Sequence, residues 1–312
     1  MVDIRIGTSG WNYSHWRNQF YPKGLAHRLE LEYLAERVNT VEINGSFYSL
    51  QRPSSYRQWR ARTPAGFVFA VKGGRFITHN KKLIDVRIPL ANFLSSGPLA
   101  LEDKLGPFLW QLPPVLRFLP DRMEEFFALL PPTVAQAGEL AADHDDRIAT
   151  RFKQDPVVTT EVLPPDSRLR HVVEVRHPSF ACDEFFDLCR RFGIAVVLAD
   201  TAGLFPWIDR RTTDFVYVRL HGSQQLYASG YTDHELDEWA ARIQGWCGET
   251  DVKAIYVYFD NDFESHAGFD SLRLAARMHS STAATDPATS ADRVVGQHRV
   301  HAPHPVDHLG DA

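Results

Sequence analysis

Eight short apolar runs recur along this chain, and most of them end in a polar or charged residue. Most of the segments between the runs are long enough to form a helix. Eight strand–helix units in a chain of 312 residues predict a single closed (β/α)8 barrel of the TIM type, which is an α/β fold. Barrels of this type carry their chemistry at the carboxyl ends of the strands. The candidate site is therefore expected at the polar endings of the runs 4–9, 41–44, 67–72, 108–111, 172–176, 194–200, 215–221 and 255–260.

The barrel is expected to occupy residues 1–279, and the composition changes after it. Residues 280–312 are rich in Ser, Thr, Ala, Pro and His, and they are expected to form a disordered tail. Within the barrel, Asp121 with Glu124 and Thr232 with Glu235 have the spacing of helix-capping boxes. The stretch 73–107 is expected to carry a loop over the site. Apolar spacing predicts helices over 28–38, 133–153, 183–192 and 265–278.

Composition excludes several classes of protein. A net charge of −5 argues against strong nonspecific attraction to nucleic acid. The three cysteines, at 182, 189 and 247, form no Cys-x-x-Cys pair, so neither a zinc knuckle nor a disulfide framework is indicated. No apolar run approaches the roughly 18 residues that a membrane helix needs. The first strand starts at Ile4 without a preceding signal-like segment, and a cytoplasmic protein is expected.

The parity of residues along each run separates the two faces of the barrel wall, because side chains alternate across a strand. In 215–221, apolar side chains share one parity, whereas Tyr217, Arg219 and His221 share the other. Charged side chains are almost never buried unless they are paired. Two explanations are therefore open, a buried ion network that fixes strand register or a polar pocket that binds a small molecule. The same rule places in the interior Arg5, Ser9, Glu42, Asn44, Lys72, Gln111, Glu174, Arg176, Asp200, Tyr258 and Asp260.

Several of the run endings form motifs that occur in a fixed order. They include Gly7-Thr8-Ser9-Gly10-Trp11, Val41-Glu42-Ile43-Asn44, Phe69-Ala70-Val71-Lys72, Gln111-Leu112-Pro113-Pro114, Glu174-Val175-Arg176-His177-Pro178, Tyr217-Val218-Arg219-Leu220-His221-Gly222 and Tyr258-Phe259-Asp260-Asn261-Asp262. This ordered set resembles the YecE-like family, TIM-barrel proteins of unknown function. The resemblance covers about residues 4–278. It implies a TIM-like barrel and implies no particular reaction.

The interior residues suggest an acid–base pocket that binds an anion. Arginine holds carboxylate or phosphate through two parallel hydrogen bonds, and a lysine among other cations acquires a lowered pKa. Lys72 is therefore predicted to act as a general acid or as an imine-forming amine, with Glu174 or Asp260 as the base. A role of Lys72 as a simple ion-pair partner is the open alternative. The predicted ligand-binding residues are Ser9, Trp11, Glu42, Asn44, His79, Gln111, Arg176, Asp200, Arg219, His221 and Tyr258.

A catalytic metal is the main competing interpretation of the same residues. The carboxylates and His221 are suitable ligands, but cations in the same ring oppose a divalent ion. We expect no metal and no cofactor. The expected function is binding or transformation of a small polar anionic ligand, such as a sugar phosphate. The alternatives are a metal-assisted phosphodiester hydrolase acting on nucleic acid and a noncatalytic regulatory barrel. The expected partner is thus a small molecule, and no association with a membrane is expected. Binding to nucleic acid is possible but not favoured. The sequence does not indicate an oligomeric state.

Overall fold

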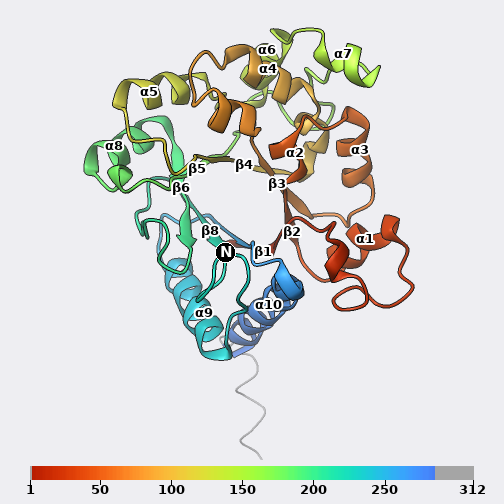
Figure 1. Ribbon diagram of the computed structural model, residues 1–312, viewed down its shortest axis with the longest axis vertical. Coiled ribbons are helices and arrows are strands. Elements are labelled where there is room, and N and C mark those ends of the chain that lie inside the picture. The colour runs from red at the N-terminus through yellow and green to blue at the C-terminus, as the bar shows by residue number, and fades with distance from the viewer. Residues whose placement is uncertain (1, 285–312) are drawn as a thin grey trace, which may run out of the picture.

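The protein forms a closed ring of parallel strands surrounded by helices, as seen in a computed structural model (Figure 1). The structure describes residues 2–284, with side chains through residue 278. The strand order is β6-β5-β4-β3-β2-β1-β9-β8-β7, and each neighbouring pair is parallel. The strands are β1 Asp3–Ser9, β2 Thr40–Ile43, β3 Val68–Lys72, β4 Leu105–Gln111, β5 His171–Glu174, β6 Ile194–Val196, β7 Leu198–Asp200, β8 Phe215–Leu220 and β9 Ala254–Phe259.

The ring closes through the segment 194–200, whose first half pairs with β5 and whose second half pairs with β8. β6 pairs with β5 in the register His171↔Ile194, and β7 pairs with β8 in the register Leu198↔Val218. Val197 lies between them, and its N–H donates to the carbonyl of Val173 at 2.9 Å. The single run predicted over 194–200 thus forms both ends of the strand order. The predicted (β/α)8 barrel is confirmed.

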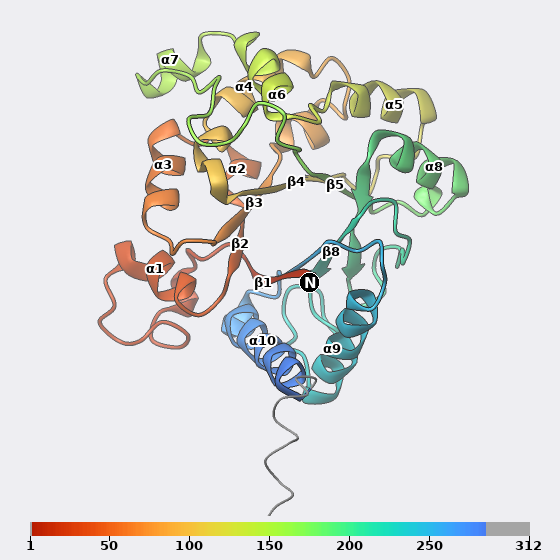
Figure 2. The same cartoon turned by 180° about the vertical axis from the view of Figure 1, so that it is seen from behind.

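The helices lie outside the ring, and α9 and α10 pack side by side (Figures 1 and 2). The segment 201–214, between β7 and β8, contains no helix. Short 3-10 turns span Ser14–Trp16, His27–Leu29, Pro98–Lys104, Pro178–Phe180 and Phe263–Ser265, and Phe76–Asn80 forms a π-helical turn. The α-helices are α1 Glu30–Ala35, α2 Gly45–Tyr48, α3 Pro53–Ala61, α4 Arg87–Ser95, α5 Pro120–Leu129, α6 Val134–Ala142, α7 Arg147–Phe152, α8 Asp183–Phe192, α9 Asp233–Cys247 and α10 His266–Ala284.

Of the two predicted helix caps, one is confirmed and the other is wrong. Thr232 and Glu235 form the predicted capping box at the start of α9. The cap predicted at Asp121 is wrong, because α5 begins with Pro120 and Leu119 occupies the cap position without a side-chain hydrogen bond. Proline suits the first helical position because its missing N–H would have no partner there. α10 continues past 279 to Ala284, and the rest of the predicted tail, 285–312, lies outside the described residues.

The barrel interior has an apolar lower part and a polar upper part. Side chains such as Leu109, Val172 and Tyr256 fill the interior toward the amino ends of the strands. A separate and larger apolar cluster lies between the outer faces of the strands and the helices. Apolar burial at about 25 cal/mol per Å² stabilises both layers. Most of the inward-facing charged residues lie at the carboxyl ends of the strands, whereas Arg5 and Arg170 lie toward the amino ends, where Arg170 donates to the Tyr256 hydroxyl.

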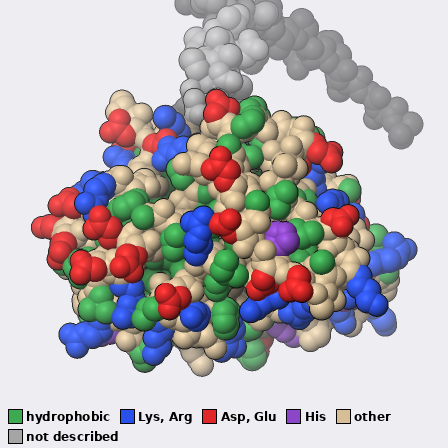
Figure 3. Space-filling view, turned by 90° about the horizontal axis from the view of Figure 1, so that it is seen from above, with side chains coloured by type: hydrophobic (Ala, Val, Ile, Leu, Met, Phe, Trp, Pro, Cys, Tyr) green, Lys and Arg blue, Asp and Glu red, His purple; other side chains and the backbone are tan. Residues whose placement is uncertain are grey.

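The outer surface carries charges of both signs. On the face shown in Figure 3, acidic and basic side chains are interspersed among polar and apolar ones. None of the helices in residues 2–284 is long and apolar enough to cross a membrane.

Candidate ligand-binding site

Arg219 is the centre of a buried ion cluster at the carboxyl end of the barrel. Its side chain comes from β8 and is completely buried. Its guanidinium donates to Glu42 on β2 at 2.8 Å and to Glu174 on β5 at 2.6 Å. It also donates at 2.8 Å to Asp260, which follows β9. One guanidinium thus joins three carboxylates from three different parts of the ring.

The pKa values of these groups reflect the mutual pairing. Burial alone would raise the pKa of Glu174, but Arg176 and Arg219 hold it well below its usual range. Burial would likewise raise the pKa of Asp260, but the charge of Arg219 and the His221 ring, whose Nδ1 is 3.0 Å away, lower it. For Arg219, burial acts to lower the pKa, and the carboxylates of Asp260, Glu42 and Glu174 raise it well above its usual value. Glu174, Asp260 and Arg219 are therefore ionised throughout the neutral range.

Polar neighbours satisfy most of the remaining positions around the cluster. The Ser9 hydroxyl accepts from Arg219 at 2.9 Å and donates to Glu42. Tyr217 donates to the second oxygen of Glu42 at 2.6 Å. His221 lies between two carboxylates, with Nδ1 3.0 Å from Asp260 and Nε2 3.6 Å from Glu174. This is the buried ion network that the strand parity allowed as one of two explanations.

Arg176 extends the network toward the opening of the barrel. Its guanidinium is 2.8 Å from Glu174, and it donates to the Tyr227 hydroxyl at 3.0 Å. The same guanidinium lies over the ring of Phe205, 4.7 Å from its centroid. Arg176 is therefore already engaged by a carboxylate, a phenol and a ring.

Lys72, at the end of β3, is a buried cation with a different environment. Its side chain is only 7% exposed, and its ammonium lies 4.5 Å from the centroid of the Phe47 ring. Within the described part of the chain, this ammonium has no hydrogen bond and no ion pair within 4 Å. Burial and the nearby Arg219 lower its pKa to about 8, against the opposing effect of the carboxylates. Lys72 is thus a cation that is held near the network without being bonded to it.

A cavity of about 580 Å³ opens above the cluster. Its aromatic wall consists of Trp11, Tyr13, Phe47, Tyr48, Trp59 and Tyr227. Asn44 donates to Ser9, while its buried Oδ1 has no partner among the described residues. The other polar groups at the wall include Lys72, Gln111, Asp260 and Asp262. The cavity therefore combines stacking surfaces, side-chain amides and carboxylates, and an unbonded cation.

The residues predicted from sequence fall into three sets. Trp11, Asn44, Lys72, Gln111 and Asp260 line the cavity. A second set lies directly beneath or beside it, namely Ser9, Glu42, His79, Glu174, Arg176, Arg219 and His221, of which His79 packs 5.1 Å from the Phe47 ring.

The third set lies elsewhere. Tyr258 is buried lower in the barrel, where its hydroxyl is 2.7 Å from that of Thr40. Asp200 accepts from Tyr231 at 3.0 Å and faces a different cavity. Arg5 is at the amino end, bonded to Asp3 and to the carbonyl of Gly66. Parity identifies which side of the wall a residue faces, but not its height along the barrel axis.

Sequence reasoning did not select several of the cavity residues, among them Tyr13, Tyr227 and Asp262. Tyr13 and Tyr227 lie outside the strands, so strand parity could not select them. Asp262 follows Asp260 in the same motif, which was a usable signal. Burial and the charge of Asp260 raise the pKa of Asp262. A carboxyl group that accepts a proton more readily than usual therefore borders the cavity.

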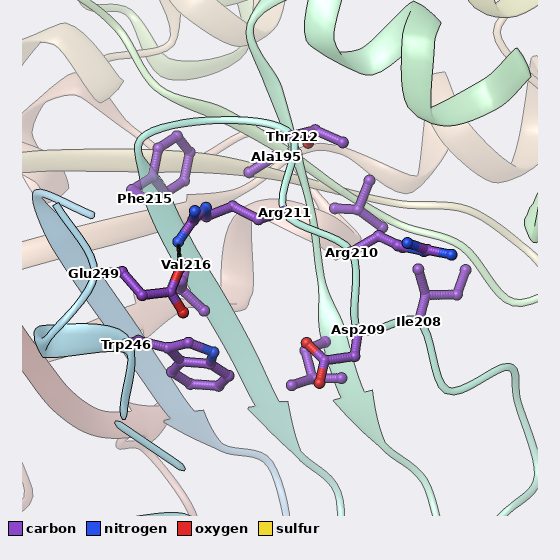
Figure 4. Close-up of a pocket in the computed structure, with 12 residues that line it drawn as sticks. Ala195, Ile208, Asp209, Arg210, Arg211, Thr212, Phe215, Val216, Trp246 and Glu249 are labelled. Atoms are coloured by element: carbon purple, nitrogen blue, oxygen red, sulfur yellow. Dashed lines mark hydrogen bonds and ion pairs between the residues drawn. The ribbon is translucent and has the colours of Figure 1, made fainter. Parts of the chain in front are cut away.

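A smaller cavity of about 210 Å³ lies beside the amino-terminal parts of β6 and β8 (Figure 4). Arg211 and Glu249 form an ion pair across it, and Phe215 and Trp246 contribute apolar surface. None of the predicted site residues lines it. We therefore assign the candidate site to the larger cavity.

The potential metal ligands of the predicted site do not form a metal-binding group. Among the side chains that the structure describes, no three His, Cys, Asp or Glu residues form a group that could hold a metal ion. Glu42, Glu174 and Asp260 converge on Arg219 instead. The carboxylates are therefore arranged around a guanidinium.

Residues 5–293 match the family described as "Protein of unknown function DUF72". This chain belongs to the DUF72 family. The match covers the barrel from residue 5 onward, including every residue of the cluster and of the cavity.

Individual relatives agree with this assignment. The UPF0759 protein YunF of Bacillus subtilis (strain 168) is 30% identical over 116 residues, which are 36% of this chain and 40% of YunF. A DUF72 protein from Thermotoga maritima MSB8 has a similar structure, with a TM-score of 0.71 at 24% identity, over 89% of this chain and 99% of that one. A DUF72 protein from Enterococcus faecalis V583 gives a TM-score of 0.65 at 17% identity, over 88% and 95%. These two similarities show the shared fold.

Proposed function

We propose that this DUF72 protein, of the YecE-like type, binds or transforms a small polar anionic ligand such as a sugar phosphate in the cavity above the ion cluster. The observation that carries the proposal is the position of Lys72. Its ammonium is buried at the cavity wall without an ion-pair partner in the described residues, although three carboxylates lie nearby. Each of those carboxylates is bonded to Arg219. The Lys72 charge therefore remains available to the anionic group of a ligand.

The presence of a buried lysine without a bonded partner among the described residues supports a functional role for Lys72. A lysine that is buried without a partner destabilises the fold, as its lowered pKa indicates. Groups of this kind concentrate at functional sites, where binding a ligand supplies the missing partner. A purely structural role would be fulfilled better by a bonded lysine, such as Lys104, which donates to Thr63 and Arg60 elsewhere in the chain.

The rest of the cavity suits a polyhydroxylated ligand. Its volume of about 580 Å³ is in the range of small-molecule sites. The side-chain amides of Asn44 and Gln111 lie at the wall and are the kind of group that hydrogen-bonds to ligand hydroxyls. The rings of Trp11 and Tyr48 provide flat apolar surface for a sugar ring.

For the two arginines we propose a different role from the one first expected. Arg176 and Arg219 already bond to carboxylates, so neither offers a free fork for an anion. We propose that they position Glu174 and Asp260 and keep both ionised next to Lys72. The expected cytoplasmic location belongs to the same proposal, because it would give the cavity access to phosphorylated metabolites.

Calorimetric titration tests the proposal with glycerol 3-phosphate, dihydroxyacetone phosphate, ribose 5-phosphate and inorganic phosphate. The wild-type protein is expected to bind at least one sugar phosphate more tightly than inorganic phosphate. Lys72→Met should weaken that binding by about ten- to a hundredfold, because a hydrogen bond to a charged group is lost. The control is Lys253→Met, which removes an exposed lysine before β9. Equal affinity in Lys72→Met, or no binding of any of these compounds to the wild type, would contradict the proposal.

A further inference from the structure

We infer that the Lys72 amine forms an imine with the carbonyl group of a small anionic ketone or aldehyde in this cavity. The inference rests on the proposed function and narrows it, because it names the reactive group of the ligand and the bond that forms. It assigns a covalent step to Lys72, whereas the proposed function alone requires only an ion pair.

The surroundings of Lys72 suit a nucleophilic amine. The nitrogen lies over the Phe47 ring and has no hydrogen bond in the described residues that would occupy its lone pair or hold it as a bonded ammonium. The side chain is nearly completely buried, and the cavity is the open space that Lys72 borders. A carbonyl compound in the cavity would therefore meet this nitrogen directly. A buried and weakly solvated amine is the usual form of an imine-forming lysine.

Burial and the charges around Lys72 determine its pKa, and hence the fraction of the side chain that is a neutral amine. Arg219 of β8 disfavours the ammonium, whereas Asp260 after β9, Glu42 of β2 and Glu174 of β5 favour it. Burial outweighs the carboxylates, and the pKa falls to about 8. About half of the Lys72 side chains are then neutral at pH 8, compared with less than about 1% of exposed lysines, whose pKa is about 10.4.

Imine formation requires proton transfers that groups at the cavity wall can carry out. The neutral amine attacks the carbonyl carbon, and the carbonyl oxygen takes up a proton as the nitrogen loses one, which gives a carbinolamine. The hydroxyl then leaves as water after receiving a proton, and a protonated imine remains. Asp262 borders the same cavity and has a raised pKa, so we assign the proton donation to its carboxyl group.

The class of substrate follows from the charges. Lys72 is the only cation among the residues that line the described cavity. A protonated imine keeps the positive charge on the same nitrogen, so the anionic group should lie within a few bonds of the carbonyl. Dihydroxyacetone phosphate and pyruvate have this arrangement, and both are suitable probes.

Reductive trapping tests the inference on the full-length protein. Each probe is added at pH 8 with sodium borohydride, which converts an imine to a stable secondary amine, and the modified lysine is located by peptide mass spectrometry. We expect labelling at Lys72, competition by glycerol 3-phosphate, which has no carbonyl, and at least about tenfold less labelling at pH 6, where the neutral amine is about fiftyfold scarcer. Asp262→Asn should slow the labelling.

Two variants separate the possible outcomes. Lys72→Arg keeps a cation but has no neutral amine, so labelling should be abolished, whereas Lys253→Arg should be labelled like the wild type. Labelling spread over exposed lysines and unchanged in Lys72→Arg would overturn the inference. Glycerol 3-phosphate binding that depends on Lys72, without trapping of either carbonyl probe, would overturn the imine and leave the proposed function intact.

Discussion

The guanidinium of Arg219 and the carboxylate of Glu174 form an ion pair of 2.6 Å between β8 and β5, with both side chains essentially inaccessible to solvent. The pair connects strands that are not neighbours in the barrel wall. Arg219 also bonds to Glu42 and Asp260, so its removal would leave three buried carboxylates without this partner. The interior charges therefore contribute to stability as a unit, and the cavity lies above them.

Replacing Arg219 by methionine should destabilise the protein severely. Breaking a buried ion pair by removing one partner costs about 3–5 kcal/mol, because an uncompensated charge remains. Urea denaturation of Arg219→Met measures this loss directly. The control is Arg190→Met, which breaks the exposed pair with Asp187 and should cost at most about 1 kcal/mol. Similar stabilities of the two variants would show that the cluster does not hold the barrel together.

Replacing Lys72 by methionine should have the opposite effect at neutral pH. The folded state holds this lysine with a pKa of about 8, below its unfolded value, so the charged form is disfavoured by folding. The difference corresponds to roughly 3 kcal/mol in favour of the variant at pH 7, if packing is unchanged. Urea midpoints of Lys72→Met and of wild type give the difference, and a large loss of stability in the variant would contradict it.

The pH dependence gives a second measure of the same group. Between about pH 8 and 10.4 the unfolded state binds more protons at Lys72 than the folded state, so this group makes stability rise with pH. Subtracting the stability curve of Lys72→Met from that of the wild type should show this rise. A flat difference over the interval would mean that the pKa of Lys72 is not lowered.

The carboxylates predict sensitivity to acid. The folded pKa values of Glu174 and Asp260 are lowered, so their stabilisation is complete above the unfolded value of about 4 and is lost as the pH falls through the folded values. Asp260→Asn should make this dependence shallower by up to about 1.4 kcal/mol per pH unit. Urea midpoints between pH 5 and 3 measure the slope, and the exposed Asp251→Asn serves as the control. An unchanged slope in Asp260→Asn would contradict the assignment.

Gly73, directly after Lys72, is predicted to be required for packing. A Cβ at this position would lie 2.3 Å from the ring of Trp110, which is buried against Phe93 and Phe126. Gly73→Ala should therefore cost about 1–3 kcal/mol and change the tryptophan fluorescence. At the neighbouring Gly74 the nearest atom is 3.8 Å away, so Gly74→Ala is the matched control. Equal effects of the two substitutions would contradict the close contact.

The barrel fold could be predicted from the sequence, and so could the side of each strand that points into the barrel. Alternation along the runs places Glu42, Glu174 and Arg219 correctly in the interior, because one face of each strand must pack against apolar helices. It does not give the height along the barrel axis, and Tyr258 and Arg5 consequently lie below the site. The cap predicted at Asp121 fails because the capping pattern alone does not fix where a helix begins, and proline starts α5.

The pairing of the charges could not be obtained from the sequence. Arg176, Arg219 and Lys72 are equivalent inward cations by parity, but three-dimensional distances bond the two arginines to carboxylates and leave Lys72 at the cavity wall. The contributions of Tyr227 and Tyr13 depend on segments outside the strands. Such segments have no periodicity from which a side-chain direction follows.

An NMR titration of the Lys72 side chain tests the central claim most directly. Its resonance is assigned by its absence in Lys72→Met, and its pKa is followed without and with glycerol 3-phosphate, which cannot form an imine. We predict a pKa of about 8 in the free protein and a higher value in the complex, because a bound anion favours the ammonium. A pKa near the ordinary 10.4, unchanged by the phosphate compound, would contradict the account.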